Sequence, residues 1–262
     1  DFESKAKRAI RNHRWIKPKD RIAVALSGGK NSSALLYFLK KILGTRRDVR
    51  LSAIFIDEGT KGNRDCHVAA NIADAIGVEL ITGSFEEVFG KTIDKVVMEK
   101  GDRFSCTFCR VLRGKCLNRI AHDHDMTKLA LAINLDDEAQ NVLVNVFRGD
   151  PERLLKPADT LAEIVPIIRP FLPIPAREVA LYAYLHVEGF EIRQCPHSHN
   201  ALINDVHSLL NDYTWRHPST KYAIVNLSEQ LVSYGFMPGT HADICPVRGE
   251  SDLSEYRPCR ML

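Results

Sequence analysis

A glycine pair between an apolar run and a helical run constrains the fold of this chain most. The run Ser27-Gly28-Gly29-Lys30-Asn31-Ser32-Ser33 follows residues 21–26, which predict a buried strand, and precedes residues 34–41, which predict a helix. Backbone N–H groups at such a turn converge on an anion, and the helix dipole favours the same charge. The sequence therefore predicts a phosphate-binding loop, although the spacing is not the GxxxxGK[ST] of a Walker A loop.

Strand and helix patterns alternate along the chain after this loop. The predicted strands cover residues 51–56, 78–81 and 128–134, with a short extended piece at 164–171; the predicted helices cover 65–76, 85–99 and 136–148. A cysteine-bearing turn at 104–113 is expected to open a further helix. This alternation is typical of an α/β fold with a doubly wound parallel sheet, in which ligands bind at the carboxyl ends of the strands. The candidate motifs all fall at such ends.

Composition narrows the class of protein. The chain has 262 residues, a hydrophobic share of 45% and a net charge of +3. It contains no apolar run of the roughly 18 residues that a membrane span needs, so no membrane association is expected. An odd number of cysteines argues for free thiols, a metal site or a cluster rather than a disulfide framework. The seven cysteines are Cys66, Cys106, Cys109, Cys116, Cys195, Cys245 and Cys259.

Two of these cysteines form a CxxC pair, Cys106 and Cys109. Such a pair chelates iron or zinc through its thiolates. Cys195, far along the chain, is a candidate for a third ligand that would leave one coordination position open. The alternatives are a zinc site completed by His197 or His199, or simple buried thiols.

Two adjacent carboxylates, Asp136 and Asp137, stand where a predicted strand ends and a helix begins. They suit Mg²⁺ binding or general-base catalysis, and acids at a helix start also have a capping role. Arg113 lies one helical turn past Cys109, where a cation can hold a phosphate. An ordinary surface arginine is the alternative interpretation.

The loop resembles the SGGxDS pyrophosphate loop of adenylating ATP pyrophosphatases, with Asn31 in place of its aspartate. Further segments resemble one branch of that superfamily in the expected order, over most of residues 1–200. They are Ile56-Asp57-Glu58-Gly59, Cys106-Thr107-Phe108-Cys109-Arg110-Val111-Leu112-Arg113, Asn134-Leu135-Asp136-Asp137-Glu138-Ala139-Gln140, Arg169-Pro170-Phe171, Arg177–Tyr184 and Cys195-Pro196-His197-Ser198. Together they resemble the [4Fe–4S]-dependent tRNA 2-thiouridine synthetases of the TtuA/NcsA/cytosolic thiouridylase kind.

This resemblance implies a reaction. In the family, ATP with Mg²⁺ adenylates the C2 oxygen of a tRNA uridine, and sulfur then displaces AMP to give 2-thiouridine. The sulfur comes from a ubiquitin-like carrier protein with a C-terminal thiocarboxylate, or from free sulfide. The resemblance also implies an adenine nucleotide alpha hydrolase-like fold, a cytoplasmic location and a possible homodimer.

The resemblance also implies roles for single residues. Asp137, Arg113 and Asn31 take the catalytic positions, with Asp137 as the candidate base. The [4Fe–4S] cluster ligands are Cys106, Cys109 and Cys195. The nucleotide-binding positions are Ala25, Ser27, Gly28, Gly29, Lys30, Ser32, Ser33, Ile56, Ala132 and Asp136.

Three departures from the family pattern open two alternatives. Asn31 lacks the charge of the loop aspartate, Ala132-Ile133 stands where the family has Gly-His, and Arg110 stands where a glycine follows the CxxC pair. The first alternative is a non-adenylating paralogue that binds tRNA or the sulfur carrier. The second is another pyrophosphate-loop enzyme, an amidating ligase that needs neither iron nor Cys195.

Four regions are expected along the chain. Residues 1–20 form a basic helix, 21–175 the ATP-binding catalytic domain, 176–234 a helical extension with the third cluster cysteine, and 235–262 a degenerate zinc-finger-like tail. The tail keeps only Cys245 and Cys259 of two CxxC pairs, so zinc there is doubtful even with His241 nearby. The basic helix either caps the sheet as a solvated element or contacts tRNA. Its side chains are Lys5, Lys7, Arg8, Arg11, His13 and Arg14, beside Trp15.

Overall fold

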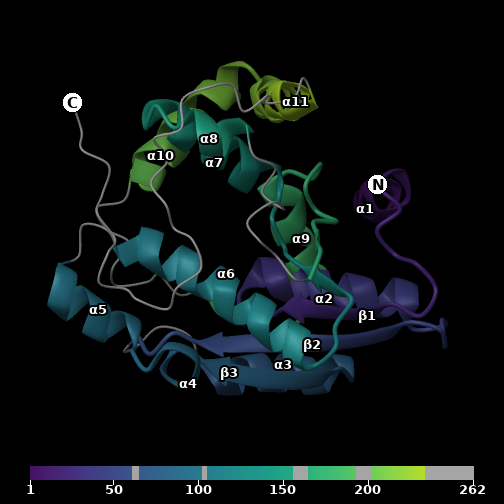
Figure 1. Ribbon diagram of the computed structural model, residues 1–262. Coiled ribbons are helices and arrows are strands. Elements are labelled where there is room, and N and C mark those ends of the chain that lie inside the picture. The colour runs from purple at the N-terminus through teal and green to yellow at the C-terminus, as the bar shows by residue number, and fades with distance from the viewer. Residues whose placement is uncertain (61–64, 102–104, 156–164, 193–201, 234–262) are drawn as a thin grey trace.

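The computed structural model describes residues 1–60, 65–101, 105–155, 165–192 and 202–233. Within them, five parallel strands form one sheet in the order β3-β2-β1-β4-β5 (Figure 1). Their bounds are β1 Arg21–Ala25, β2 Arg50–Asp57, β3 Glu79–Ser84, β4 Lys128–Ala130 and β5 Ile167–Ile168. The order reverses between β1 and β4, which is the switch point where doubly wound sheets bind ligands. The predicted fold class is confirmed.

Helices cover both faces of this sheet and form a third layer beyond it. Their bounds are α1 Phe2–Asn12, α2 Lys30–Leu43, α3 Cys66–Ile76, α4 Phe85–Phe89, α5 Ile93–Lys100, α6 Ser105–Asp123, α7 Leu135–Phe147, α8 Pro151–Leu155, α9 Ala176–His186, α10 Leu202–Arg216 and α11 Thr220–Ser233. In the described residues, no helix is long and apolar enough to cross a membrane.

Side chains of alternate strand residues supply two separate cores. In β1, Ile22 and Val24 pack with α1, α2, α3 and α9, whereas Ala23 packs with α4, α5 and α6 on the opposite face. This period of two, in a strand that is apolar on both sides, is what a buried parallel strand requires. Because β1 packs against helices on both faces of the sheet, its end and the loop that follows it are held in place.

The third layer packs on α7 rather than on the sheet. Leu135 and Ala139 of α7 form a small core with Val206 and Leu210 of α10 and Val225 of α11. In Figure 1 these helices and α8 lie above the sheet, apart from the helices that cover it. The helical extension therefore has its own apolar contact with the start of α7.

Several element bounds differ from the predicted ones. Helix α2 begins at Lys30, four residues early, because Gly29 has the extended backbone of an N-cap. The CxxC pair lies inside α6 rather than on a turn before it. Gly90 has a φ of +70° and ends α4, so the helix predicted over 85–99 is two helices. The strand predicted over 128–134 ends at Ala130.

Helix α1 packs against the body of the protein and also presents a basic face. Ala6, Ala9 and Ile10 are buried, while Arg8 and Arg11 are exposed. The structure thus shows the capping role of this helix, and its role in RNA binding stays a prediction. The division into four regions stays a prediction. Cys195, His197, His199 and the whole tail lie outside the described residues.

Candidate functional site

The glycine pair makes a tight turn from β1 into α2. Gly28 has a φ of +75°, and a Cβ atom there would lie 3.1 Å from Cγ1 of Val68. Its carbonyl accepts a hydrogen bond of 3.0 Å from the backbone N–H of Glu191. The left-handed backbone and the close neighbour both require glycine at this position. The loop is therefore held in one shape by its own sequence and by a distant segment.

The serine hydroxyls of the loop hydrogen-bond to the loop itself. Ser32 Oγ accepts from the backbone N–H of Ser27 at 3.1 Å and donates to the carbonyl of Gly29 at 3.0 Å. Ser33 Oγ donates to the same carbonyl at 2.9 Å. The hydroxyls thus stabilise the turn, which leaves the first N–H groups of α2 and the Lys30 ammonium as the groups suited to an anion.

Asn31, the departure from the family loop, lies in the first turn of α2. Its Oδ1 atom is buried and has no hydrogen-bond partner within the described part of the chain. A buried acceptor without a partner is costly, so an orphan of this kind fits a cation or donor that arrives with a ligand. An amide oxygen is a suitable ligand for Mg²⁺.

Three neighbouring strands bring the predicted nucleotide-binding residues to one edge. Ala25 ends β1, Ile56 lies one residue from the end of β2, and Ala132 follows β4 by two residues. Because the strands are parallel and adjacent, their carboxyl ends meet beside the loop. The structure thus brings these three residues and the glycine loop together.

The start of α7 faces this edge and is capped by Asn134. The Asn134 Oδ1 atom accepts from the backbone N–H groups of Asp136 at 2.9 Å and Asp137 at 3.1 Å. The Asp137 carboxylate in turn accepts from the Asn134 N–H at 3.1 Å, which completes a capping box. The Nδ2 group of Asn134 is buried and has no partner among the described residues.

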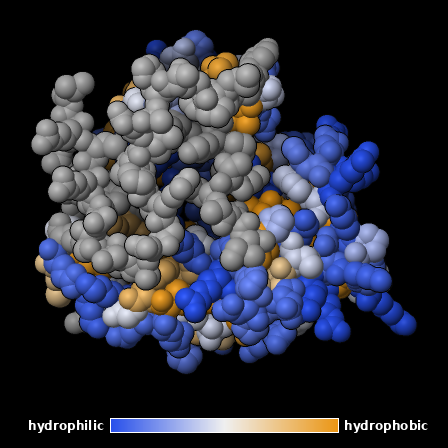
Figure 2. All heavy atoms as spheres, viewed as in Figure 1, coloured by the Kyte–Doolittle hydropathy of each residue, from blue (hydrophilic) through white to orange (hydrophobic). Residues whose placement is uncertain are grey.

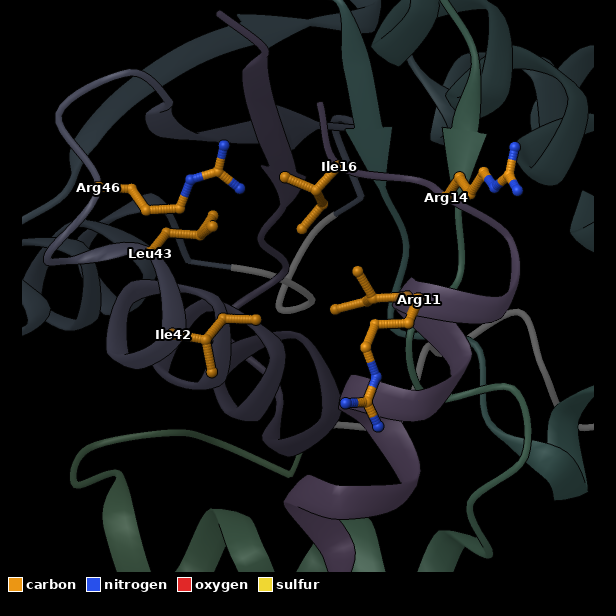
Figure 3. Close-up of a pocket in the computed structure, with 7 residues that line it drawn as sticks. Arg11, Arg14, Ile16, Ile42, Leu43 and Arg46 are labelled. Atoms are coloured by element: carbon orange, nitrogen blue, oxygen red, sulfur yellow. The ribbon is translucent and has the colours of Figure 1, made fainter. Parts of the chain in front are cut away.

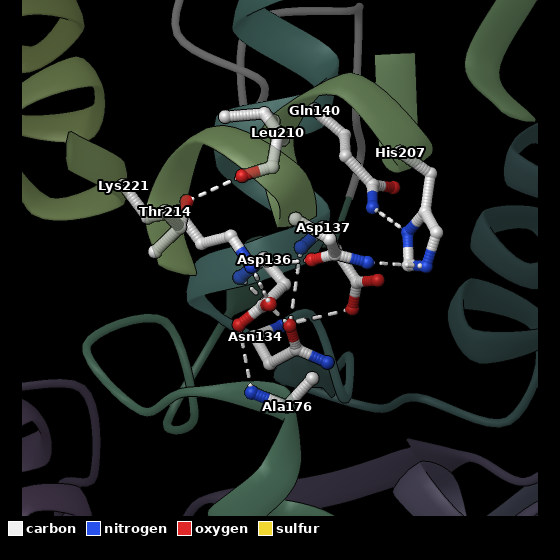
Figure 4. A network of polar contacts seen from close by, with 10 residues as sticks. Asn134, Asp136, Asp137, Gln140, Ala176, His207, Leu210, Thr214 and Lys221 are labelled. Atoms are coloured by element: carbon white, nitrogen blue, oxygen red, sulfur yellow. Dashed lines mark hydrogen bonds and ion pairs between the residues drawn. The ribbon is translucent and has the colours of Figure 1, made fainter. Parts of the chain in front are cut away.

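Asp136 connects α7 to the helices of the C-terminal part (Figure 4). Its Oδ2 atom accepts from the backbone N–H of Ala176 at 2.8 Å, and its Oδ1 atom pairs with the ammonium of Lys221 on α11. The side chains of Asp136 and Lys221 are only 13% and 10% exposed. Both carboxylate oxygens therefore have protein partners, so the geometry gives Asp136 a bracing role.

Asp137 differs from its neighbour in electrostatics. Loss of hydration within the surrounding protein, together with the adjacent carboxylates of Asp136 and Glu138, raises its pKa to about 6. The hydrogen bond from the Asn134 N–H and the charge of Lys30 act in the opposite direction. The influence of Lys30 shows that the loop and the start of α7 share one electrostatic environment. A carboxylate with such a pKa suits proton transfer near neutral pH.

Arg113 lies on α6 between a buried carboxylate and a buried thiol. Its Nε group pairs with Glu58, and its Nη2 group donates to Cys109 Sγ at 3.1 Å. Burial works against its charge, but Glu58 and Cys109 outweigh this and raise the pKa of Arg113. In this structure the Arg113 guanidinium therefore binds the Glu58 carboxylate and the Cys109 sulfur.

The predicted cluster ligands are described only in part. Cys106 and Cys109 both fall within the range of α6, three residues apart in the chain. Cys109 is buried, and Cys195 lies outside the described residues. In the parts that the structure describes, no three Cys, His, Asp or Glu side chains form a metal-binding group. Of the three predicted ligands, the structure therefore describes the side chain of Cys109 alone.

Sequence reasoning assigned no role to three residues of this region, although Glu58 and Asn134 stand in the segments that resemble the family. Asn134 carried a local signal, since an asparagine before Asp136 and Asp137 is a typical N-cap. Glu58 and Lys221 carried none, because their partners Arg113 and Asp136 are 55 and 85 residues away in the chain. Only the fold brings these charges together.

Comparison with known proteins places this geometry in a family. The profile of the PP-loop domain matches residues 1–194. A tRNA 2-thiolation protein NcsA from Haloferax volcanii is 33% identical over 251 residues, which cover 87% of this chain and 77% of that protein. A cytoplasmic tRNA 2-thiolation protein 1 from Anopheles gambiae is 30% identical over 99% of this chain and 78% of its own length.

A solved structure agrees with these sequence relatives. The U34-tRNA thiolase NcsA from Methanococcus maripaludis, with its [4Fe–4S] cluster, matches with a TM-score of 0.80 and 29% identity over 90% of this chain and 78% of that chain. Fold and loop are thus those of a PP-loop domain. Within that class, the chain belongs to the family of tRNA 2-thiolation proteins. The resemblance inferred from the motifs is confirmed.

Proposed function

We propose that this protein is an ATP-dependent tRNA 2-thiouridine synthetase, which activates a uridine with ATP and replaces its C2 oxygen with sulfur. One observation carries the proposal: the loop of β1 and α2 faces Asp137, an acid with a pKa of about 6, in a chain whose relatives are tRNA 2-thiolation proteins. A phosphate-binding turn beside a poised base is what the adenylation of a weak nucleophile needs.

The proposed activation step follows from these groups. The uridine C2 oxygen attacks the α-phosphorus of ATP, the bond between the α-phosphorus and its bridging oxygen breaks, and pyrophosphate leaves. Asp137 accepts the proton from uridine N3, which makes the C2 oxygen a better nucleophile. Lys30 and the first N–H groups of α2 hold the charge that develops on the phosphates. Hydrosulfide, supplied free or by hydrolysis of the carrier's thiocarboxylate, then adds at C2. The bond between C2 and the adenylate oxygen breaks, AMP leaves, and the sulfide proton passes to N3.

Asn31 remains compatible with this step. Its orphan Oδ1 atom is an acceptor that a Mg²⁺ ion on the phosphates would satisfy. The same amide, rotated by half a turn, would offer its NH₂ group to a phosphate oxygen. We therefore propose Mg²⁺ as the cation of the site and Asn31 as the group that meets either the cation or a phosphate.

Cys106, Cys109 and Cys195 are the residues we propose to hold a [4Fe–4S] cluster. When bound, such a cluster with an open iron position supplies a coordination site for the incoming sulfur. Arg113 donates a hydrogen bond of 3.1 Å to Cys109 Sγ and so orients this sulfur as a ligand. The proposed sulfur source is a carrier protein with a C-terminal thiocarboxylate, or free sulfide, and a homodimer is proposed as the assembly.

Pyrophosphate release tests the proposal and separates it from its alternatives. Anaerobically reconstituted protein is given ATP, Mg²⁺ and unmodified tRNA, and pyrophosphate is measured with and without the tRNA. We expect tRNA-dependent release that Lys30→Gln reduces by at least tenfold. Lys115→Gln, an exposed lysine on α6, is the matched control and should leave the rate unchanged. ATP binding without any release would support the non-adenylating paralogue, and release that depends on ammonia instead of tRNA would support the amidating ligase.

A further inference from the structure

An arginine-lined pocket lies at the edge of the protein opposite to the nucleotide loop. It has a volume of about 370 Å³, and we refer to it as the arginine pocket. Its lining includes Arg11, Arg14, Ile16, Ile42, Leu43 and Arg46. Figure 3 shows Arg11 and Arg46 on different sides of it, with Ile16 between them. The pocket thus has an aliphatic floor, with Arg11 and Arg46 beside it and Arg14 at its outer rim.

The arginine pocket is separate from the proposed catalytic site. It is built from the ends of α1 and α2 and from the segment before β1, so it lies beyond the amino ends of the strands. The nucleotide loop precedes α2, which has 14 residues. At 1.5 Å per residue, the two sites are about 21 Å apart along this helix. A ligand of the pocket cannot be the reacting ATP.

The charge of the arginine pocket is largely uncompensated. Arg46 pairs with Asp48 through contacts of 3.0 and 2.6 Å, but Arg11 and Arg14 form no ion pair with any described residue. The buried Asp20 carboxylate accepts instead from the backbone N–H of Lys17 and from the hydroxyl of Thr127.

The segments around the arginine pocket also carry an excess of positive charge. Residues 8–20 and 44–50 together contain eight lysines and arginines but two acids, whereas the whole chain has a net charge of only +3. Hydrophilic side chains dominate the side of the molecule near α1 in Figure 2. The excess positive charge of the chain is thus concentrated around the arginine pocket.

The local backbone adds aromatic surface and an unusual conformation. Arg14 has a φ of +51°, a left-handed conformation that arginine adopts at an energetic cost. The rings of His13 and Trp15, on either side of it, stack with centroids 4.4 Å apart. Basic side chains interleaved with stacked rings are typical of surfaces that bind nucleic acid.

From these observations we propose that the arginine pocket binds backbone phosphates of the tRNA, at a distance from the uridine that reacts. The inference rests on the proposed function, which supplies the RNA substrate. Guanidinium groups bind phosphate oxygens in pairs, and the aliphatic floor provides a surface for a ribose. A tRNA is long enough to reach both edges of the sheet, whereas a free nucleotide is not. The pocket thereby orients the tRNA through sequence-independent contacts.

The test compares tRNA binding by three forms of the full chain at several salt concentrations. The double variant Arg11→Gln, Arg14→Asn removes both unpaired guanidinium groups, and asparagine tolerates the left-handed backbone at position 14. The control is Arg47→Gln, an exposed arginine that is next to Arg46 but does not line the pocket. Melting temperature and ATP affinity are measured for all three forms to confirm that the fold and the loop are intact.

We expect the double variant to bind tRNA about tenfold more weakly, with a salt dependence reduced by about two ions, and the control to match the wild type. Equal affinity and equal salt dependence for double variant and wild type would overturn the pocket proposal alone. The pocket proposal would also be overturned if the double variant bound tRNA normally but bound a phosphate-containing small molecule or a lipid vesicle more weakly than the wild type does. If the wild type binds no tRNA, the proposed function itself fails.

Discussion

The buried pair between Asp136 and Lys221 should be the largest single electrostatic contribution to the docking of α11. Lys221→Met removes the ammonium and leaves the Asp136 carboxylate with only the Ala176 N–H, at 2.8 Å. Loss of one partner of a buried ion pair costs roughly 3–5 kcal/mol. Because the two side chains are 10% and 13% exposed, we expect the lower value, about 3 kcal/mol. That corresponds to a decrease of about 150-fold in the folding equilibrium constant.

Urea unfolding of the single and double variants measures this cost. The double variant Asp136→Asn, Lys221→Met contains no unpaired buried charge. Its loss in free energy of unfolding should therefore be smaller than the sum of the losses of the two single variants, by at least about 1 kcal/mol. Hydrogen exchange should become faster in α11, which buries only Lys221 and Val225 among its described residues. The control is Lys95→Met, whose pair with Glu86 is exposed and should contribute less than about 1 kcal/mol.

The reasoning is refuted if Lys221→Met changes stability no more than Lys95→Met does. It is also refuted if the losses of the two single variants simply add in the double variant. Either result would mean that Asp136 is not braced by α11, and its carboxylate would again be a candidate ligand for Mg²⁺.

Three further predictions concern Asp137, Glu3 and Gly28. As a base whose pKa is raised to about 6, Asp137 must be ionised to act, so kcat/KM should rise tenfold per pH unit below pH 6 and level off above it. In Asp137→Asn, kcat/KM should no longer depend on pH in this range and should fall by about 10²–10⁴-fold. An unchanged pH profile would show that another group is the base. The pKa of Glu3 is lowered to about 2 by hydrogen bonds from Lys41, Tyr182 and Lys7, so the stability it contributes is present above pH 4.5 and lost as the pH falls toward 2. Glu3→Gln should therefore cost about 1–2 kcal/mol at pH 7, and the difference from the wild type should shrink in acid urea titrations; a constant difference would contradict this. Gly28→Ala should destabilise the loop by about 1–2 kcal/mol, since its φ is +75°, and lower ATP affinity in calorimetry; unchanged affinity would mean that the turn does not bind the phosphates.

Local sequence signals predicted the sheet and the loop because these depend on neighbouring residues. The apolar run at 21–26 and the glycine pair after it determine a strand, a turn and a helix start without help from the rest of the chain. The same holds for Asp136 and Asp137, whose position at a helix start was evident. The exact start of a helix depends on its N-cap. Gly29 caps α2, so this helix begins four residues before the predicted position.

The bracing contacts could not be predicted, because they join residues far apart in the chain. Nothing near Lys221 indicates that its ammonium is buried against Asp136, and nothing near Glu58 indicates a pairing with Arg113. The same holds for the arginine pocket: a basic first helix was evident, but its meeting with Arg46 at the end of α2 is a product of the fold.

The formation of 2-thiouridine in tRNA is the measurement that tests the central claim most directly. Reconstituted protein is incubated with unmodified tRNA, ATP, Mg²⁺ and sulfide, and the digested nucleosides are analysed by mass spectrometry. The account predicts 2-thiouridine that requires ATP and appears in equal amount with AMP. The product is lost in Cys109→Ser but retained in Cys66→Ser, an exposed cysteine that is not among the proposed cluster ligands. AMP formation without any thiolated nucleoside, or 2-thiouridine formed without ATP, would contradict it.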